Sequence, residues 1–535
     1  MADRADTRGH RPAPRSDDAD AVAALAADLA DAGYRVDAVE RLLGPIAAAA
    51  LHRGRRVSAR RALDAAVGGG AEAARLATLV RLFLLGEPVD AAALDAALPR
   101  TGAAGAAALG VVAADGAPAI DLRPYAVVDE LGVGQWWVAS DLGELAVGGP
   151  LPVDHVLGVG GASTTLAGIL IGEPVDRVLD LGTGCGIIAL HAARTARHVV
   201  ATDVSARAIA FARFTAALSG VDRIEFRLGD LFEPVAGERF DRVVSNPPFV
   251  ITPRVDGVPS YEYRDGGRVG DAIVEAVVRG AAEVLVPGGI AQLLGNWEDR
   301  SGAGSGGSGG DSGGSGRDGL DRVGDWIADA GLDGWVIERE RQDPAEYAEL
   351  WIRDGGTVAG RASDALESAW LADFAERGVT GVGFGYVALR RPPAGTAARP
   401  PRLERITGPI GGAVGSAIRA GLLAAEALEA LDDEAFAARC LVVAPDVTEE
   451  RHLWPGAEDP SVILLRQGTG FARTIQVGTA VAAVVGACDG DLPLGAICDA
   501  VAEVLDVDAV ALRAEVLPQA RELVVCGLLA IAPTD

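Results

Sequence analysis

A short stretch that ends near residue 250 has the composition of a site that orients a planar nitrogen. FDRVVSNPPFVI (240–251) has the pattern of a buried strand that ends in Asn246, Pro247, Pro248 and Phe249. An amide or aromatic amine nitrogen is a poor nucleophile, because its lone pair is delocalised. The side-chain oxygen of Asn246 and the carbonyl oxygen of Pro247 can each accept one N–H of such a group. Consecutive prolines stiffen the loop, and Phe249 offers a flat face to a planar amide or base.

A glycine turn 60 residues upstream has the pattern of a nucleotide-like ligand site. VLDLGTGCGIIAL (178–190) is a buried-strand run through Asp180, followed by a turn that opens a helical pattern. The turn residues are Gly182, Thr183, Gly184 and Gly186. Such a turn lets backbone approach a ligand closely, and an acidic residue about 20 positions further on usually takes ribose hydroxyls. Asp203 has that position.

The elements that must position these residues are the strands of a parallel sheet. Buried-strand patterns separated by helix-like sequence or short turns occur at Val178–Leu181, Val199–Thr202, Ile224–Arg227, Arg242–Ser245 and Ile290–Leu294. The pattern predicts a doubly wound, mostly parallel α/β sheet, with last strands at Gly334–Glu338 and Val382–Leu389. Ligands bind at the carboxyl ends of such strands. Asp180, Asp203, Asp230 and Asn246 follow four of these strands, so we expect them to converge in space.

Taken together, these motifs resemble the class I S-adenosylmethionine-dependent methyltransferases. GTGCG is the methyltransferase form of the glycine turn, whereas dinucleotide-binding proteins carry GxGxxG. GDLFEPVAGERFDRVVSNPPFVI is similar to the methyltransferases that act on the side-chain amide of glutamine in translation release factors, and the DGG at 265–267 extends that similarity. The resemblance covers roughly Asp154 to Arg391 and implies a Rossmann-like methyltransferase domain. This family commonly has Tyr after the prolines, where the present chain has Phe249.

The resemblance also implies a role for each motif residue. S-adenosyl-L-methionine is the expected cofactor, with its amino-acid end held by Asp180 and the amides around Gly182 to Gly186. Asp203, followed by Val204, is expected to accept from the ribose hydroxyls. Asp230 is expected to accept from the adenine amino group, with Leu231 packed nearby. The catalytic residues are then Asn246, Pro247, Pro248 and Phe249, and no metal is expected.

Three functions remain open at this stage. The first is an N-methyltransferase acting on a glutamine amide of a protein, possibly a translation factor. The second is an RNA methyltransferase acting on an exocyclic amine of adenine or guanine, because NPPF-type loops also serve such amines. The third is a non-catalytic scaffold with a relic methyltransferase domain, against which the intact Asp180, Asp203 and Asp230 count.

The composition of the chain limits its partners, the state of its cysteines and its location. The 535 residues carry a formal net charge of −27, which disfavours non-specific nucleic-acid binding. Five cysteines, with no CxxC spacing, predict free thiols in a reducing compartment. Neither a spanning apolar run nor an apolar signal core is present, so we expect a cytoplasmic protein with no membrane partner.

The order of patterns along the chain predicts four segments. Residues 1–19 are expected to be a disordered tail, and residues 20–145 a helical, winged-helix-like domain whose strand–turn–strand ribbon is LGVVAADGAPAIDL (109–122). Residues 146–396 form the predicted methyltransferase domain, with a flexible Gly/Ser insert at 301–316. Residues 397–535 are predicted to be a second winged-helix-like α+β domain, with three helices and a final strand after residue 477. Trp136 and Trp137 either line a substrate cleft or pack in the core and over a domain seam.

Overall fold

The computed structural model describes residues 12–147, 151–255, 258, 264, 266–301, 318–355, 357 and 360–533. The chain divides into two compact units. The first comprises Met1–Leu166, Pro174–Val336 and Glu340–Pro401, and the second comprises Ala167–Glu173, Ile337–Arg339 and Arg402–Asp535. Apart from Ser301, the expected flexible insert lies outside the described residues, as do residues 1–11 of the expected tail.

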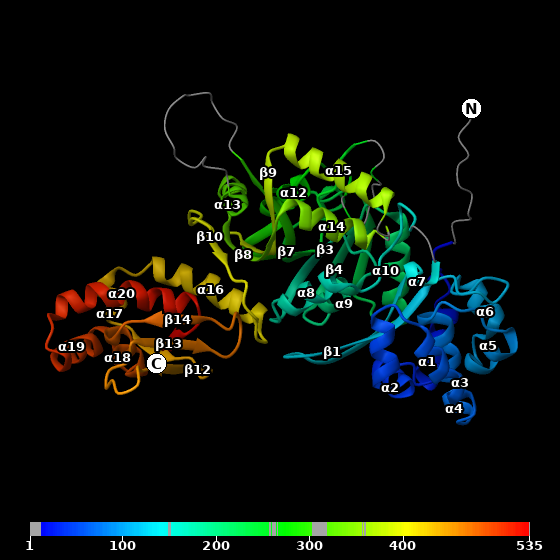
Figure 1. The fold of residues 1–535 in the computed structure, drawn as a ribbon, viewed down its shortest axis with the longest axis horizontal. Helices are drawn as coiled ribbons and strands as arrows, with labels where there is room; N and C mark the ends of the chain where they lie inside the picture. Colours follow the sequence, from blue (N-terminus) through cyan, green and yellow to red (C-terminus); the bar gives the residue numbers. More distant parts are fainter. Residues whose placement is uncertain are drawn as a thin grey trace. The chain divides into compact units, whose positions relative to one another are not determined.

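A mostly parallel sheet is the centre of the first unit (Figure 1). Its strands are β3 (Val175–Leu181), β4 (Ala196–Asp203), β5 (Ile224–Leu228), β6 (Phe240–Ser245), β7 (Leu285–Arg300), β8 (Asp333–Gln342) and β9 (Val379–Arg390). They lie in the order β8-β9-β7-β6-β3-β4-β5. Each strand from β7 through β6, β3 and β4 to β5 is parallel to the next one in this order, and β9 is antiparallel to β7. The predicted α/β class and all seven predicted strands are confirmed. Each observed strand extends one or more residues beyond its predicted range.

Helices pack against this sheet, because packing buries the apolar face of each helix. They are α8 (Gly161–Ile169), α9 (Ile187–Ala192), α10 (Ala206–Leu218), α12 (Ala272–Val284), α13 (Gly319–Asp329), α14 (Pro344–Asp354) and α15 (Arg361–Glu376). A 3₁₀ turn, η2 (Glu233–Val235), follows β5. α9 and α10 pack on β3 to β5, whereas α12 and α13 pack on β7, and α14 and α15 on β9.

A helical module precedes the sheet in the same unit. Its helices are α1 (Ala19–Asp31), α2 (Val36–His52), α3 (Val57–Val67), α4 (Ala71–Leu79), α5 (Ala91–Ala97) and α6 (Gly102–Ala108), with a π-helical turn η1 (Val80–Leu84) after α4. The hairpin β1 (Asp121–Asp129) and β2 (Gly132–Ser140) and the short α7 (Glu144–Val147) follow. Residues 12–18 of the expected tail lie against this module: Pro14 is buried, and the Arg15 amide donates to the Leu109 carbonyl at 2.9 Å.

The ribbon predicted at 109–122 is wrong. That segment forms a single bridge, between Val112 and Pro118, and the hairpin instead pairs Asp121–Asp129 with Gly132–Ser140. Val111, Val112 and Ile120 are all buried, so the segment fills the core of the helical module and does not show the one-sided burial of a ribbon. The Asp-Gly turn does form, with Gly116 at φ 78°.

The second unit is α+β. Its helices are α16 (Val414–Glu429), α17 (Asp433–Ala437), α18 (Thr479–Gly486), α19 (Leu494–Leu505) and α20 (Ala509–Val525). Its strands are β10 (Arg402–Arg405), β11 (Cys440–Val443), β12 (Val447–His452), β13 (Val462–Gln467), β14 (Thr474–Val477), β15 (Asp489–Pro493) and β16 (Leu529–Ile531). Two small sheets have the orders β15-β11-β16 and β12-β13-β14, and β10 continues to Ile406, whose amide donates to the carbonyl of Glu338 in β8. The three helices and final strand predicted after residue 477 are confirmed, with β15 in addition.

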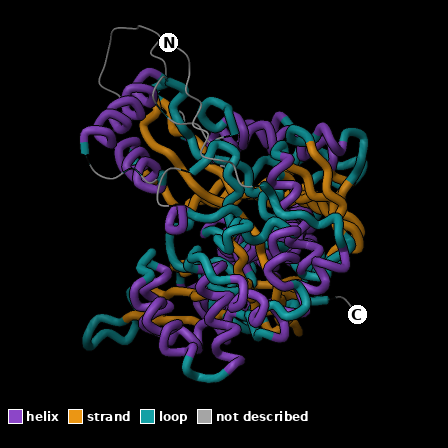
Figure 2. The backbone as a smooth tube through the Cα atoms, turned by 90° about the vertical axis from the view of Figure 1, so that its right-hand side faces the viewer, coloured by secondary structure: helices purple, strands orange, loops and turns teal. Residues whose placement is uncertain are grey.

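Figure 2 distinguishes the helices from the strands of both units along the whole trace. No helix among the described residues has the length and apolar character needed to cross a membrane. All five cysteines are free thiols, as the sequence predicted.

Candidate active site at the carboxyl ends of the central strands

The glycine turn is fixed to the neighbouring strand by backbone hydrogen bonds. The amides of Gly182 and Thr183 each donate to the carbonyl of Thr202 in β4, at 2.9 Å. The Gly184 amide donates to Oδ2 of Asp203, also at 2.9 Å. The end of β4 therefore holds the turn that follows β3, and places Asp203 directly beside it.

The glycines of this turn have two different jobs. Gly182 and Gly184 have φ values of 77° and 56°, and a Cβ on either would meet nothing within 4 Å. A Cβ on Gly186 would lie 3.1 Å from the Cα of Ala212 in α10. All three positions favour glycine for their positive φ; Gly186, at φ 87°, also allows α9 and α10 to pack closely, whereas Gly182 and Gly184 border open space.

Asp180 is a buried carboxylate with an unused acceptor. It is 1% exposed, and its Oδ2 accepts from the Thr183 hydroxyl at 2.7 Å. Its Oδ1 has no hydrogen-bond partner among the described residues. Burial raises the pKa of the Asp180 carboxyl to about 7, and the nearby Asp203 charge acts in the same direction. A cationic or N–H donor group brought to Oδ1 would favour the ionised carboxylate.

Asp203 and the loop after β5 lie together at the next strand ends. Asp203 Oδ1 accepts from the Ser205 amide at 2.8 Å, and its carbonyl accepts from the Gly229 amide at 3.0 Å. Val204 is 62% exposed, an unusual environment for a valine. The Gly229 bond places the Asp230 loop beside β4.

That loop presents one carboxylate and one strained residue. Asp230 is exposed, and its Oδ2 lies 3.5 Å from the Arg268 guanidinium. Leu231 has a left-handed φ of 43°, which costs a non-glycine residue about 1–3 kcal/mol, and such strain concentrates at ligand sites.

Asn246 comes directly beside the glycine turn. β6 pairs with β3 in parallel register, so that Ser245 is opposite Leu181, and the Ser245 hydroxyl donates to the Leu181 carbonyl at 2.8 Å. The next residue of each strand is therefore Asn246 on one side and Gly182 on the other. Asn246 Oδ1 is buried and has no hydrogen-bond partner among the described residues. Asp180, Asp203 and Asn246, three of the four residues predicted to converge, lie at neighbouring strand ends, and the Gly229 bond places the loop of the fourth, Asp230, beside β4.

The rest of the NPPF loop is packed. Pro247 is buried and Pro248 partly so. Phe249 is 7% exposed, and its ring centroid lies 5.5 Å from that of Phe384 in β9. Phe249 is therefore mostly buried, with Phe384 of β9 as one neighbour, and little of the flat face that the sequence suggested is exposed.

Two further groups that the sequence did not single out hold the end of this loop. The Val250 amide donates to the Arg264 carbonyl at 2.9 Å, and the Ile251 amide donates to the Tyr347 hydroxyl at 3.0 Å. Tyr347 belongs to QDPAEYAELWIRDGG (342–356), a stretch with no recognisable motif. Its separation of 96 residues from Ile251 gives no local signal that could have revealed the contact.

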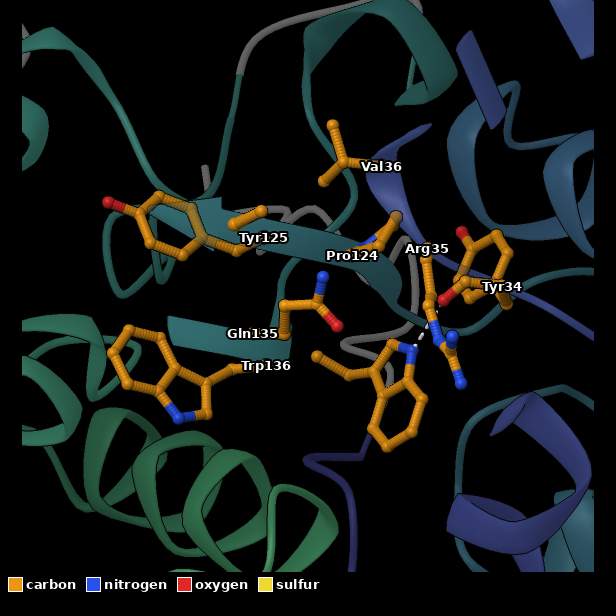
Figure 3. Close-up of a pocket in the computed structure, with 9 residues that line it drawn as sticks. Tyr34, Arg35, Val36, Pro124, Tyr125, Gln135 and Trp136 are labelled. Carbon is orange, nitrogen blue, oxygen red and sulfur yellow. Dashed lines mark hydrogen bonds between the residues drawn. The ribbon is translucent and has the colours of Figure 1, made fainter. Parts of the chain in front are cut away.

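Away from the glycine turn, the β1–β2 hairpin borders a cavity of about 170 Å³ (Figure 3). Its lining residues are Tyr34, Arg35, Val36, Pro124, Tyr125, Ala126, Gln135, Trp136 and Trp137. The Trp137 indole donates to the Tyr34 carbonyl at 2.8 Å, and Trp136 stacks on Tyr125 with ring centroids 6.0 Å apart. Both tryptophans thus line a cavity, and neither lies among the predicted cofactor or NPPF residues.

Comparison with known proteins identifies the segment that contains this site. Residues 158–300 match the family model "Methyltransferase small domain", which includes β3 to β7, the glycine turn and the NPPF loop. This segment is therefore similar to methyltransferase small domains. A separate match covers residues 31–124 and is described as a domain of unknown function, DUF7059. α14, with Tyr347, lies outside both matches.

Curated relatives are similar to part of the chain. A release factor glutamine methyltransferase of Cereibacter sphaeroides is 42% identical over 130 residues, which are 22% of this chain and 46% of that protein. A ribosomal protein uL3 glutamine methyltransferase of Bradyrhizobium diazoefficiens is 37% identical over 135 residues, 23% of this chain and 42% of that protein. The chain thus spans about half the length of the curated relatives it matches.

Similarity to solved structures is weak in overall shape. The YcgJ protein of Bacillus subtilis is 14% identical, with a TM-score of 0.28, over 43% of this chain and 97% of that chain. A score this low adds nothing to the functional assignment, which depends on the site and on the sequence matches.

Proposed function

We propose that the protein is an S-adenosyl-L-methionine-dependent N-methyltransferase that methylates a glutamine side-chain amide of a protein, such as a translation factor. The observation that carries this proposal is the juxtaposition of Asp180, Asp203 and Asn246 at adjacent strand ends of a methyltransferase small domain. The curated relatives named as glutamine methyltransferases support the choice of acceptor.

The residues at the glycine turn fit the cofactor. Asp180 Oδ1 is a buried acceptor without a partner, suited to an ammonium group, and the space in front of Gly182 and Gly184 is open. Asp203, whose carboxylate accepts from the Gly184 and Ser205 amides at the end of β4, is the acceptor that we assign to the ribose hydroxyls. When bound, the cofactor supplies a methyl group on a positively charged sulfur.

The loop after β5 suits the base of the cofactor. Asp230 is exposed and can accept from an amino group, while Val204 and Leu231 supply apolar contacts on either side. Coverage by a flat apolar ring would account for the exposure of Val204 and for the strained backbone of Leu231.

The NPPF loop fits the acceptor. Asn246 Oδ1 is buried and can accept one N–H of a glutamine amide, and the Pro247 carbonyl can accept the other. Two such bonds fix the plane of the amide and aim its nitrogen at the transferable methyl group. Catalysis then consists of positioning and of a polar environment already in place, with no strong general base required.

Charge favours a protein acceptor over RNA. The chain carries a net charge of −27, which repels a polyphosphate backbone. An exocyclic base amine fits the same NPPF geometry, so the acceptor must be tested directly. A substrate of the translation apparatus also supports a cytoplasmic location.

The test uses tritiated S-adenosylmethionine, the purified protein and lysate from cells that lack it. One half of the labelled lysate is treated with protease and the other with ribonuclease. We expect protease alone to release the label from the macromolecular fraction. Release by ribonuclease alone would overturn the proposed acceptor, and no label in either half, together with no cofactor binding, would favour a scaffold function.

A further inference from the structure

The NPPF loop is held at its far end by a tyrosine from another part of the chain. Tyr347 lies in the first turn of α14, whose start is fixed by Asp343: this side chain accepts from the Ala345 and Glu346 amides at 2.8 and 3.0 Å, and Pro344 follows it. Only 3% of Tyr347 is exposed. Because α14 begins at a defined residue, Tyr347 has a defined position, with its hydroxyl next to β7 and the NPPF loop.

The hydroxyl of Tyr347 joins two buried donors. It accepts from the Ile251 amide at 3.0 Å and from the side-chain nitrogen of Asn296 at 2.5 Å. Ile251 is fully buried and Asn296 is 1% exposed on β7. A hydroxyl has two acceptor lone pairs, and both are used here. Burial raises the pKa of the Tyr347 phenol well above its usual range, so the group stays neutral and keeps this geometry at physiological pH.

The ring itself is clamped by aromatic neighbours. The ring centroids of Trp351, Trp370 and Phe374 lie 6.0, 6.2 and 6.1 Å from that of Tyr347. Trp351 belongs to α14, and Trp370 and Phe374 to α15. A rigid ring makes the hydroxyl a fixed point, unlike a hydroxyl on a mobile surface side chain.

The hydrogen bonds after the two prolines of the NPPF loop, among the described residues, are two backbone amide bonds. Pro247 and Pro248 have no N–H to donate. In the next residues, the Val250 amide donates to the Arg264 carbonyl and the Ile251 amide donates to the Tyr347 hydroxyl. Removal of the Tyr347 hydroxyl would leave the buried Ile251 N–H without an acceptor, five residues after Asn246.

We propose that Tyr347 is a positioning residue of this enzyme: its hydroxyl, bonded to Ile251 and Asn296, sets the place of the NPPF loop relative to β7. The role in transfer rests on the proposed methyltransferase function, whereas the contact itself does not. Tyr347 does not touch the predicted reacting atoms and acts through Asn246. It lies outside residues 158–300, so the methyltransferase small domain is completed by a helix that the family match does not include.

The first test measures the contact without any methyl acceptor. Tyr347→Phe removes one hydroxyl, and Thr215→Val is the matched control, because the buried Thr215 hydroxyl accepts from the Ala139 amide at 3.1 Å, in a different part of the unit. In hydrogen–deuterium exchange, Tyr347→Phe should speed exchange of the Ile251 amide by roughly 10- to 100-fold. Thr215→Val should leave Ile251 unchanged. Equal exchange at Ile251 in wild type and Tyr347→Phe would overturn the proposal.

The second test separates positioning from general stability. With tritiated S-adenosylmethionine and the lysate fraction that contains the acceptor, Tyr347→Phe should lower kcat by about 10-fold or more, as small misplacements do. Its affinity for S-adenosylhomocysteine should remain that of the wild type. An equal loss of kcat in Thr215→Val, or a kcat unchanged in Tyr347→Phe, would contradict the positioning role. Absence of transfer by the wild type would contradict the proposed function itself, and the exchange experiment would still decide the contact.

Discussion

Two buried oxygens without partners mark the site at the scale of single residues. Asp180 Oδ1 and Asn246 Oδ1 lie near the carboxyl ends of the adjacent strands β3 and β6, and both are among the buried polar atoms that have no partner in the described part of the chain. Each unpaired atom costs about 1–3 kcal/mol of stability. The cofactor ammonium at Asp180 and the acceptor amide at Asn246 would each restore this loss, which is why these two positions support a binding site better than the glycine turn alone.

The first prediction concerns Asn246. Asn246→Ala should abolish measurable methyl transfer, because the acceptor amide loses the oxygen that fixes its orientation. Affinity for S-adenosylhomocysteine, measured by calorimetry, should stay within about threefold of wild type, less than the effect of one lost hydrogen bond. An active Asn246→Ala enzyme would remove the NPPF loop from the mechanism.

The second prediction concerns the pH dependence of Asp180. Its folded-state pKa is raised to about 7 by burial, whereas the unfolded chain loses the same proton near about 3.9. Between these two pKa values the folded state binds more protons than the unfolded state. The stability contributed by the protonated Asp180 carboxyl is therefore lost as the pH rises from the lower value to the higher one. Thermal denaturation of the ligand-free protein should show this fall, and Asp180→Asn should lack it.

The same variant checks the binding role. Asp180→Asn should also bind S-adenosylhomocysteine at least about 10-fold more weakly at pH 8, because a charge-assisted bond is lost. If the stability of the wild type and that of Asp180→Asn changed in parallel over the pH range between the two pKa values, the raised pKa of the buried Asp180 carboxyl would be contradicted.

At the scale of elements, buried ion pairs hold the strand that supports the NPPF loop. Arg322 of α13 donates to both carboxylate oxygens of Asp271 and to the Glu298 carbonyl on β7. Glu298 is fully buried and pairs with Arg300 and Arg377. Asp271 precedes α12, so this network joins α12, α13 and β7 beside the site.

The third prediction is that this network is needed for stability. Arg322→Met leaves the Asp271 carboxylate, only 2% exposed, short of its main cation and should cost about 3 kcal/mol of unfolding free energy. Arg279→Met is the matched control, because Arg279 makes exposed pairs with Glu275 and Asp329 and should cost less than about 1 kcal/mol. Urea unfolding curves measure both, and equal losses would contradict the distinction.

The sequence predicted the strands of the central sheet. It missed features that depend on contacts between residues far apart in the chain. Buried runs such as 178–181 and 242–245 can only be central parallel strands, and their ends place Asp180 and Asn246 without further information. The hairpin at 109–122 failed because an Asp-Gly turn specifies a local reversal, whereas the burial of Val112 and Ile120 is decided by the helical module. Tyr347 and Phe384 meet the NPPF loop across about a hundred residues, a contact that no local pattern encodes.

At the scale of the whole molecule, net charge is the property that bears most on the partner. A chain at −27 should not bind RNA without specificity. The fourth prediction is that a labelled single-stranded RNA shows no retention in a filter-binding assay at about 0.15 M salt, where non-specific RNA-binding proteins have dissociation constants of about 10⁻⁴ to 10⁻⁶ M. Retention that weakens steeply with added salt would indicate a basic surface and revive the RNA acceptor.

The two units differ in what they contribute. The first contains the predicted cofactor and acceptor residues, the helical module and Tyr347. The second has its own core of buried residues, including Phe436, Leu465, Leu494 and Leu528.

The central claim is that the methylated atom is the side-chain nitrogen of a glutamine, and one measurement tests it most directly. Acceptor protein labelled by the wild-type enzyme is digested to completion, and the labelled residue is identified by chromatography and mass spectrometry, with Asn246→Ala enzyme as the control. We expect glutamine carrying one methyl group on its side-chain nitrogen, absent from the Asn246→Ala sample. Label on a methylated adenine or guanine, or on any other amino acid, would contradict it.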